Sequence, residues 1–201
     1  MPRHRSFALL AASVLCAAAP AFARWHPAAG SVDAFNAPAI AVPAAGRLEV
    51  GFSPNAGAEQ LVLRVIGSAQ REIRILAYTF TSARITAALR DARHRGVAVS
   101  LVVDHKANLI DDRSGRARHA LAALANAGCR IRTISAYSIH HDKVIIADAR
   151  TVETGSFNYS DAAAYRNSEN VLVNWNNPAL ARIYLEHWQR RFAEGEDYRP
   201  Y

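Results

Sequence analysis

The sequence predicts an α/β layered domain whose mostly parallel central sheet is flanked by helices. From residue 47 onward, short apolar runs alternate with stretches in which apolar residues recur at helical spacing. That alternation is typical of layered domains with parallel strands. The chain has 201 residues, of which 51% are hydrophobic and 20% charged, which is enough for one sizeable core and too apolar for intrinsic disorder. We therefore expect one folded domain, over residues 46–201.

The first half of this domain alternates two strands with two helices. A strand over 47–52 is stopped by a Ser-Pro pair, and a helix over 59–69 carries an apolar stripe. A second strand is predicted over 73–78. Ser82 is placed to cap the next helix, which runs to residue 95 and ends at a glycine.

The second half begins with a run over 97–103 that is almost wholly apolar, as expected of a strand covered on both faces. A helix over 116–127 stops at a glycine. An Asn-Pro pair at 177–178 opens the last helix, which ends at Gly195. The other predicted strands lie at 130–134, 143–147 and 171–175.

The first residues have the pattern of a secretory signal peptide. Two arginines precede an apolar run over 7–19, and the tripeptide Ala-Phe-Ala at 21–23 supplies a cleavage site. We expect a signal peptide over 1–23, cleavage after Ala23 and a periplasmic or secreted protein; a buried N-terminal helix is the alternative. The segment holds no acidic residue, so cleavage lowers the formal net charge from +7 to +5.

Residues 24–45 form a lead-in rich in Ala and Pro, with no helix or strand period. Cleavage before it removes Cys16 and leaves Cys129, which we expect to be a buried apolar residue at the start of a strand. Of the 24 basic residues, only Lys106 and Lys143 are lysines, so a lysine in this chain is an exception that needs a reason.

The most informative stretch is Ile-His-His-Asp-Lys-Val-Ile-Ile-Ala-Asp at 139–148. His141 and Lys143 are two residues apart, so on one strand they face the same side, while Val144 and Ile146 face the other and anchor the strand. A histidine can attack phosphorus or pass a proton near neutral pH, and an ammonium can neutralise a phosphate oxygen. Together they predict chemistry on a phosphate group.

Two later stretches supply neutral and acidic partners for this pair. In Gly-Ser-Phe-Asn at 155–158, the glycine permits close backbone approach, and Ser156 and Asn158 supply hydrogen-bonding groups. In Asn-Ser-Glu-Asn at 167–170, Glu169 precedes an apolar strand, where a carboxylate could orient an imidazole through its second nitrogen.

The spacing His141-x-Lys143, then Asp148, then Gly155-Ser156-x-Asn158 resembles the HKD signature of the phospholipase D superfamily. The likeness continues through longer stretches and spans roughly residues 47–201. Those stretches resemble the small bacterial Nuc-type endonucleases: His-Asp-Lys-Val-Ile-Ile at 141–146, Val-Glu-Thr-Gly-Ser-Phe-Asn at 152–158, Asn-Ser-Glu-Asn at 167–170, Leu-Glu-His-Trp-Gln at 185–189 and Tyr-Thr-Phe-Thr-Ser at 78–82.

This resemblance implies a metal-independent phosphodiesterase without a cofactor, acting on DNA, with RNA as an additional substrate. The catalytic residues that it implies are His141, Lys143, Ser156, Asn158 and Glu169, with Asp148 in a supporting, structural role. His141 would attack phosphorus and form a phosphohistidine that water then cleaves. Lys143 and Asn158 would hold the phosphoryl oxygens, and Glu169 would hydrogen-bond His141 and fix its tautomer.

The same mechanism needs a second imidazole as general acid, and the chain carries the His-x-Lys motif once. We therefore expect a two-fold symmetric homodimer in which two His141 side chains meet at the interface. They would titrate as a coupled pair and give a bell-shaped pH profile.

Several readings stay open beside this one. Lys106, Arg113, Arg116 and Arg166 are candidates for binding a phosphate backbone, or else ordinary surface charges. A phospholipase is the first alternative function, against which we find no membrane segment and no clear amphipathic anchor after signal cleavage. A binding protein without activity is disfavoured by the intact motif. His140, His141 and Asp142 do not predict a metal site, because three adjacent strand residues cannot converge on one ion. His187 is expected to pack.

Overall fold

Eight strands and five α-helices make up the part of the chain that the computed structural model describes, residues 38–200. The strands are β1 (Arg47–Ser53), β2 (Glu72–Ala77), β3 (Ala98–Asp104), β4 (Arg130–Ile134), β5 (Lys143–Ala147), β6 (Thr151–Gly155), β7 (Glu169–Trp175) and β8 (Glu196–Asp197). The helices are α1 (Ala58–Ser68), α2 (Ala83–His94), α3 (Arg116–Asn126), α4 (Asp161–Tyr165) and α5 (Pro178–Glu194), with one π-helical turn, η2 (Lys106–Ile110).

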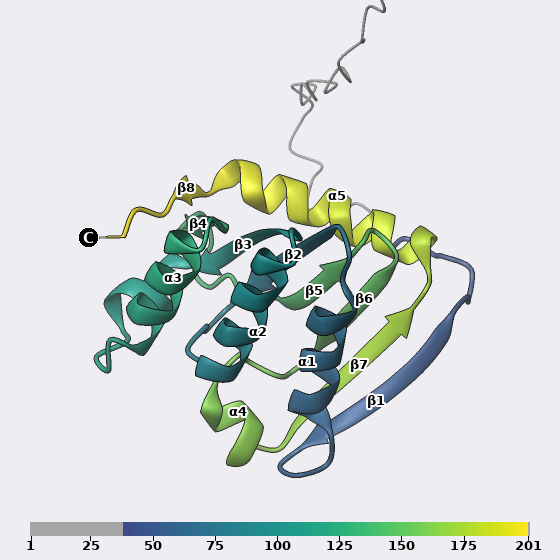
Figure 1. Cartoon of the computed structure of the whole chain (residues 1–201). Helices are drawn as coiled ribbons and strands as arrows, with labels where there is room; N and C mark the ends of the chain where they lie inside the picture. Colours follow the sequence, from purple (N-terminus) through teal and green to yellow (C-terminus); the bar gives the residue numbers. More distant parts are fainter. Residues whose placement is uncertain (1–37, 201) are drawn as a thin grey trace, which may run out of the picture. The chain divides into compact units, whose positions relative to one another are not determined.

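One sheet contains all the strands, in the order β1-β7-β6-β5-β2-β3-β4-β8 (Figure 1). The predicted layered α/β class is confirmed, but the expectation that the sheet is mostly parallel is wrong. Only β2 with β3 and β3 with β4 run parallel, and every other neighbouring pair is antiparallel. The tight turn between β5 and β6 accounts for one of these pairs, because a connection of this length can join only antiparallel strands.

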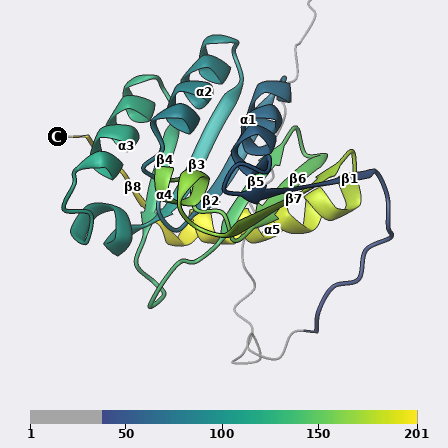
Figure 2. The same ribbon diagram turned by 90° about the horizontal axis from the view of Figure 1, so that it is seen from below.

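Helices cover both faces of the sheet (Figure 2). On one face, α1, α2 and α3 bury a core that includes Leu61, Leu89 and Leu121. On the other face, α5 packs through Trp188 against a second cluster. Strand β5 contributes to both: Ile145 faces the first core, while Val144 and Ile146 face the second, as the alternation of the sequence predicts.

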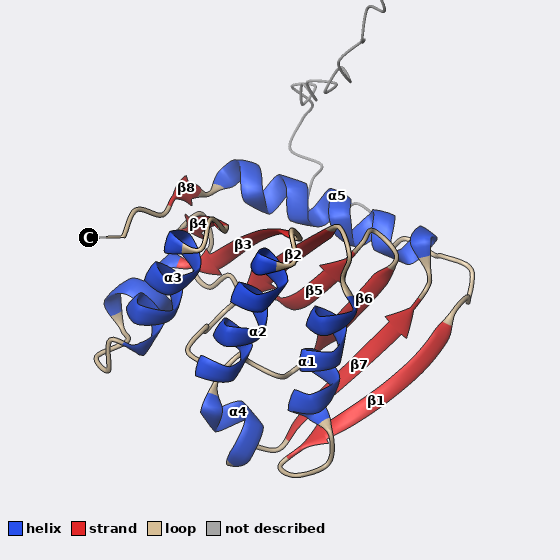
Figure 3. Cartoon of the chain, viewed as in Figure 1, coloured by secondary structure: helices blue, strands red, loops and turns tan. Residues whose placement is uncertain are grey.

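Figure 3 shows the observed helices and strands. The predicted elements agree with them to within two residues at each end. The Ser82 hydroxyl accepts a hydrogen bond from the backbone N–H of Ile85 at 3.3 Å and so caps α2. Cys129 is buried directly before β4, and burial raises the pKa of its thiol to about 11. The sequence does not predict β6, β8, α4 or η2.

Contacts group residues from Ala41 onward into one unit, which contains the whole sheet. The predicted signal peptide and most of the lead-in lie outside the described residues. Within residues 38–200, no helix is both long and apolar enough to cross a membrane.

Candidate active site

The residues of the motif line a single pocket because three neighbouring strands present their ends at one edge of the sheet. Strands β5, β6 and β7 are antiparallel neighbours, so the start of β5, the end of β6 and the start of β7 meet. They enclose a pocket of about 530 Å³. Its lining residues are His141, Lys143, Gly155, Ser156, Asn158, Glu169 and Asn170. All five predicted catalytic residues are therefore brought together.

His141 lies two residues before β5, with its side chain exposed at the pocket. The ring of Tyr78, which follows β2, lies against it with 4.8 Å between ring centroids. Within residues 38–200, the only side-chain hydrogen bond to His141 is the one that its backbone carbonyl accepts from Lys143. Neither ring nitrogen of His141 has a hydrogen-bond partner there. The imidazole is thus free to react with a group that enters the pocket.

Lys143 is 5% exposed, and its ammonium lies against the backbone of His141. The Nζ atom donates to the carbonyl oxygen of His141 at 2.8 Å and lies 5.2 Å from the centre of the Tyr78 ring. Burial lowers the pKa of Lys143, and the nearby carboxylates of Asp142 and Glu169 partly offset that effect. The site therefore holds a desolvated cation where a phosphoryl oxygen would bind.

Glu169 makes different contacts from those the sequence predicts. Its carboxylate accepts a 2.6 Å hydrogen bond from the Ser156 hydroxyl and a 2.9 Å hydrogen bond from the Asn167 side-chain amide. No hydrogen bond joins it to His141 within the part of the chain that the structure describes. The expected Glu169–His141 contact is thus not made within one chain, because the carboxylate is instead bound by the hydroxyl of Ser156, which lies opposite the start of β7.

Gly155 allows this close arrangement of β6 and β7. A Cβ atom at this position would lie far inside van der Waals contact of the Asn170 carbonyl oxygen. That carbonyl accepts a 3.1 Å hydrogen bond from the backbone N–H of Ser156, and the backbone N–H of Asn170 donates to the Ser156 hydroxyl at 3.0 Å. The glycine therefore fixes the position of Ser156 in the pocket wall.

Asn158 lines the same pocket from the turn after β6. Its side-chain carbonyl oxygen is buried and has no hydrogen-bond partner among residues 38–200. Buried polar atoms are usually paired, and an exception in a pocket is typical of a group that binds a ligand.

Asp148 lies at the other end of β5, about 16 Å along the strand from Lys143 at the usual rise per residue. Its carboxylate accepts backbone N–H groups from Gln70, Arg71 and Glu72 at 2.8–3.0 Å, which fastens the turn after β5 to the start of β2. Those contacts hold its pKa below the usual range although burial opposes them. Its position is that of a structural residue.

None of the four candidate substrate-binding cations lines the 530 Å³ pocket. Lys106 is exposed on η2, Arg113 is exposed in the loop before α3, and Arg166 is exposed at the end of α4. Arg116 pairs with Asp161 at 3.6 Å and lines a separate pocket of about 510 Å³ between α2 and α3. Within one chain, the structure does not bring these residues together as a groove around the motif.

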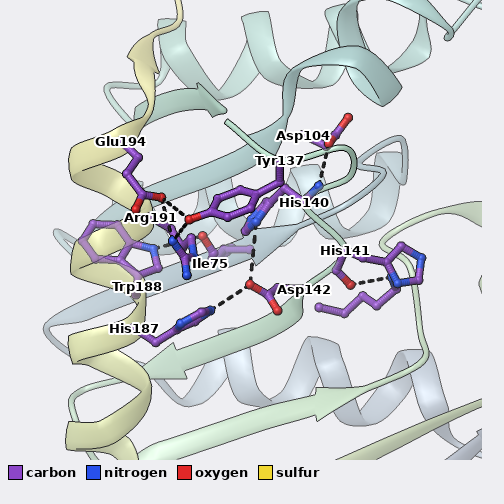
Figure 4. Close-up of polar contacts among 11 residues, drawn as sticks. Ile75, Asp104, Tyr137, His140, His141, Asp142, His187, Trp188, Arg191 and Glu194 are labelled. Carbon is purple, nitrogen blue, oxygen red and sulfur yellow. Dashed lines mark hydrogen bonds and ion pairs between the residues drawn. The ribbon is translucent and has the colours of Figure 1, made fainter. Parts of the chain in front are cut away.

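Two groups beside the motif are not among the site residues predicted from the sequence. Tyr78 contacts both reactive side chains, and only its place in the Tyr-Thr-Phe-Thr-Ser stretch pointed to it. His187 was expected to pack, but its Nε2 lies 2.9 Å from a carboxylate oxygen of Asp142 (Figure 4). His140 is buried, as a core contact would be.

No group of three or more His, Cys, Asp or Glu side chains in residues 38–200 is arranged to hold a metal ion.

Comparisons with known proteins agree with this geometry. A family model described as "Cardiolipin synthase, PLD-like domain" matches residues 62–192. The crystal structure of Nuc, a phospholipase D family member from Salmonella typhimurium, is similar with a TM-score of 0.73 and 48% identity, covering 76% of this chain and 98% of that one.

Two curated relatives have names that refer to lipids. A phospholipase D from Rickettsia bellii is 38% identical over 142 residues, which is 71% of this chain and 67% of the relative. A mitochondrial cardiolipin hydrolase from Xenopus laevis is 26% identical over 135 residues, which is 67% of this chain and 60% of the relative.

Proposed function

The chain belongs to the phospholipase D superfamily and is a phosphodiester hydrolase, and on that premise we propose that it is a non-specific endonuclease of the periplasm or the exterior. Its substrate is DNA, and RNA is a further nucleic-acid substrate. The reaction needs no metal. The signal peptide over 1–23 directs its export. The observation that carries the proposal is a pocket that joins a free imidazole to a desolvated ammonium.

The proposed reaction has two steps. A ring nitrogen of His141 attacks phosphorus, the bond from phosphorus to the leaving oxygen breaks, and that oxygen takes a proton from an imidazolium. Water then attacks the phosphohistidine, gives a proton to the imidazole that was the acid, and the phosphorus–nitrogen bond breaks. Lys143 and Asn158 hold the non-bridging oxygens as charge builds on them.

The acid in this scheme is His141 of the partner subunit. The pocket is lined by one histidine, and the chain has one His-x-Lys motif, so a single chain offers the nucleophile without the acid. An exposed His141 at the sheet edge is compatible with a two-fold axis passing beside it. Activity then requires one neutral and one protonated imidazole, which gives a bell-shaped pH profile.

The extent of the similarity to Nuc favours nucleic acid over lipid as the substrate. The chain matches 98% of Nuc at 48% identity, whereas it matches 67% of the Rickettsia bellii phospholipase D at 38%. The excess of basic residues suits a polyanion. Phospholipid headgroup hydrolysis remains the second candidate, because the names of the curated relatives refer to it and the same site chemistry serves it.

One experiment separates the candidates. The purified mature protein is incubated with plasmid DNA and with phosphatidylcholine vesicles, with and without EDTA, beside His141→Ala. Plasmid degradation that persists in EDTA and disappears in the variant supports the proposal. Choline release without plasmid cleavage would favour the lipase, and activity abolished by EDTA and restored by zinc or magnesium would refute the phosphohistidine route.

A further inference from the structure

Asp142 lies between the two reactive residues but points away from them. His141 and Lys143 line the pocket, and Asp142, which is absent from its lining, turns towards α5 (Figure 4). There its Oδ2 accepts a hydrogen bond from the Nε2 of His187 at 2.9 Å. The two residues are 45 positions apart, so this contact joins the catalytic segment to the last helix.

The helix at this point is firmly attached to the sheet. Trp188, the neighbour of His187, is 6% exposed and donates from its indole N–H to the carbonyl of Ile75 on β2 at 3.0 Å. Its ring stacks on Phe192 with 4.5 Å between centroids. His187 therefore offers its N–H from a fixed position, and α5 contributes no residue to the pocket.

His140 makes a longer contact with the same carboxylate (Figure 4). Its ring is buried, its Nδ1 is 3.7 Å from Asp142, and burial lowers its pKa. Its backbone N–H donates to Asp104 at 2.8 Å, which holds the segment from the other side. His187 is thus the hydrogen-bond partner of Asp142, and Asp142 is the sequence neighbour of the first residue of β5.

That neighbour is Lys143, a buried ammonium whose one hydrogen bond within the described chain goes to a neutral carbonyl. A buried cation needs a counter-charge to stay protonated. We propose that the His187–Asp142 pair positions the segment carrying His141 and Lys143. The charge of Asp142 also opposes the effect of burial on the Lys143 ammonium. His187 and Asp142 are positioning residues, since neither touches the reacting atoms.

The electrostatic surroundings support this assignment. Of the two carboxylates that oppose the desolvation of Lys143, Asp142 has the larger effect and Glu169 the smaller. The pKa of Asp142 is itself held low, against burial, by the hydrogen bond and charge of His187 and by the charges of His140 and Arg191. The charged and titratable groups facing this network are Tyr78, Asp104, Tyr137, His140, His141, Glu169, His187, Arg191 and Glu194.

The inference rests on the proposed function only in assuming phosphodiester cleavage at Lys143, and its main test needs no turnover. The chain contains two lysines, so lysine labelled with ¹³C at the ε carbon gives two NMR signals. Burial lowers the pKa of Lys143, so its signal is expected to titrate at lower pH than that of an ordinary exposed lysine. In Asp142→Asn, and in His187→Ala to a smaller extent, the titration of Lys143 moves to still lower pH.

Two further variants separate positioning from a general loss of structure. His187→Gln keeps an N–H near the same place and should restore the wild-type titration of Lys143. Gln189→Ala, at an exposed position on the same helix, should leave it unchanged. Should Asp142→Asn not fold, the comparison of His187→Ala with His187→Gln decides alone.

A second readout uses bis(4-nitrophenyl) phosphate, a small substrate that is neither DNA nor lipid. Per folded molecule, His187→Ala should lose about tenfold or more in kcat with little change in KM, and His187→Gln should recover most of it. An unchanged Lys143 titration in both Asp142→Asn and His187→Ala would overturn the inference. An inactive wild type with a shifted Lys143 titration would instead refute the proposed function and leave the pairing intact.

Discussion

Replacing Glu153 by glutamine should remove a large pH dependence of stability. Glu153 lies on β6, two residues before Gly155, and is 0% exposed. One carboxyl oxygen accepts a 2.9 Å hydrogen bond from Tyr159, and the other has no partner among the described residues. Burial raises the pKa of Glu153 from 4.5 to about 8, although the Tyr159 hydrogen bond opposes it.

The sign and the size of the effect follow from this difference. Between pH 4.5 and about 8 the folded chain keeps the proton of Glu153 and the unfolded chain has lost it. Stability therefore falls as pH rises through this window, by about 1.4 kcal/mol per pH unit and about 5 kcal/mol in total. Above about pH 8 both states are ionised and the contribution becomes constant.

Glutamine has the same shape and no proton to lose, so Glu153→Gln should lack this slope. Urea unfolding followed by circular dichroism at pH 5, 7 and 9 measures it, with exposed Glu196→Gln as a control that removes one carboxylate elsewhere. The stability difference between Glu153→Gln and wild type should grow with pH, while the control stays parallel to wild type. The reasoning would be refuted if the free energy of unfolding changed with pH in the same way in all three proteins.

Three further predictions concern the site and its supports. Gly155→Ala should force β6 and β7 apart at the Asn170 carbonyl and lower both the melting temperature and the plasmid-cleaving activity. Gly67→Ala is the control, because a Cβ atom there meets open space, and it should leave activity nearly unchanged and stability unchanged or slightly improved. Asp148→Ala should cost about 2–3 kcal/mol in urea unfolding through its lost backbone acceptors, while kcat per folded molecule stays at the wild-type value. Equal amounts of wild type and His141→Ala, allowed to exchange subunits, should show about a quarter of the activity of wild type at the same total concentration, whereas independent sites would give about half.

Local signals were sufficient for most of the elements and for the contents of the pocket. Apolar spacing, the Ser82 cap and terminal glycines gave the boundaries of the helices, because these features act over a few residues. The spacing of His141 and Lys143 also placed them on one side of β5, since a strand alternates its side chains strictly.

Features that depend on contacts between residues far apart in the sequence could not be predicted from local patterns. β6 was missed because its pattern is interrupted by Glu153, a buried carboxyl that the sequence alone marks as exposed, and without β6 the antiparallel half of the sheet cannot be seen. The bond between His187 and Asp142 depends on the rotation of α5 about its axis, which Trp188 fixes on β2. Glu169 was assigned to His141, whereas the strand pairing gives it to Ser156.

Trapping the covalent intermediate tests the central claim most directly. A DNA oligonucleotide is mixed with the protein in EDTA, the reaction is quenched at alkaline pH within its first turnovers, and the digested protein is analysed by mass spectrometry. We predict a phosphoryl-DNA adduct on His141 that is stable in alkali and lost in acid, and that is missing from His141→Ala. Cleavage of the oligonucleotide without any adduct on His141, or cleavage retained by His141→Ala, would contradict the account.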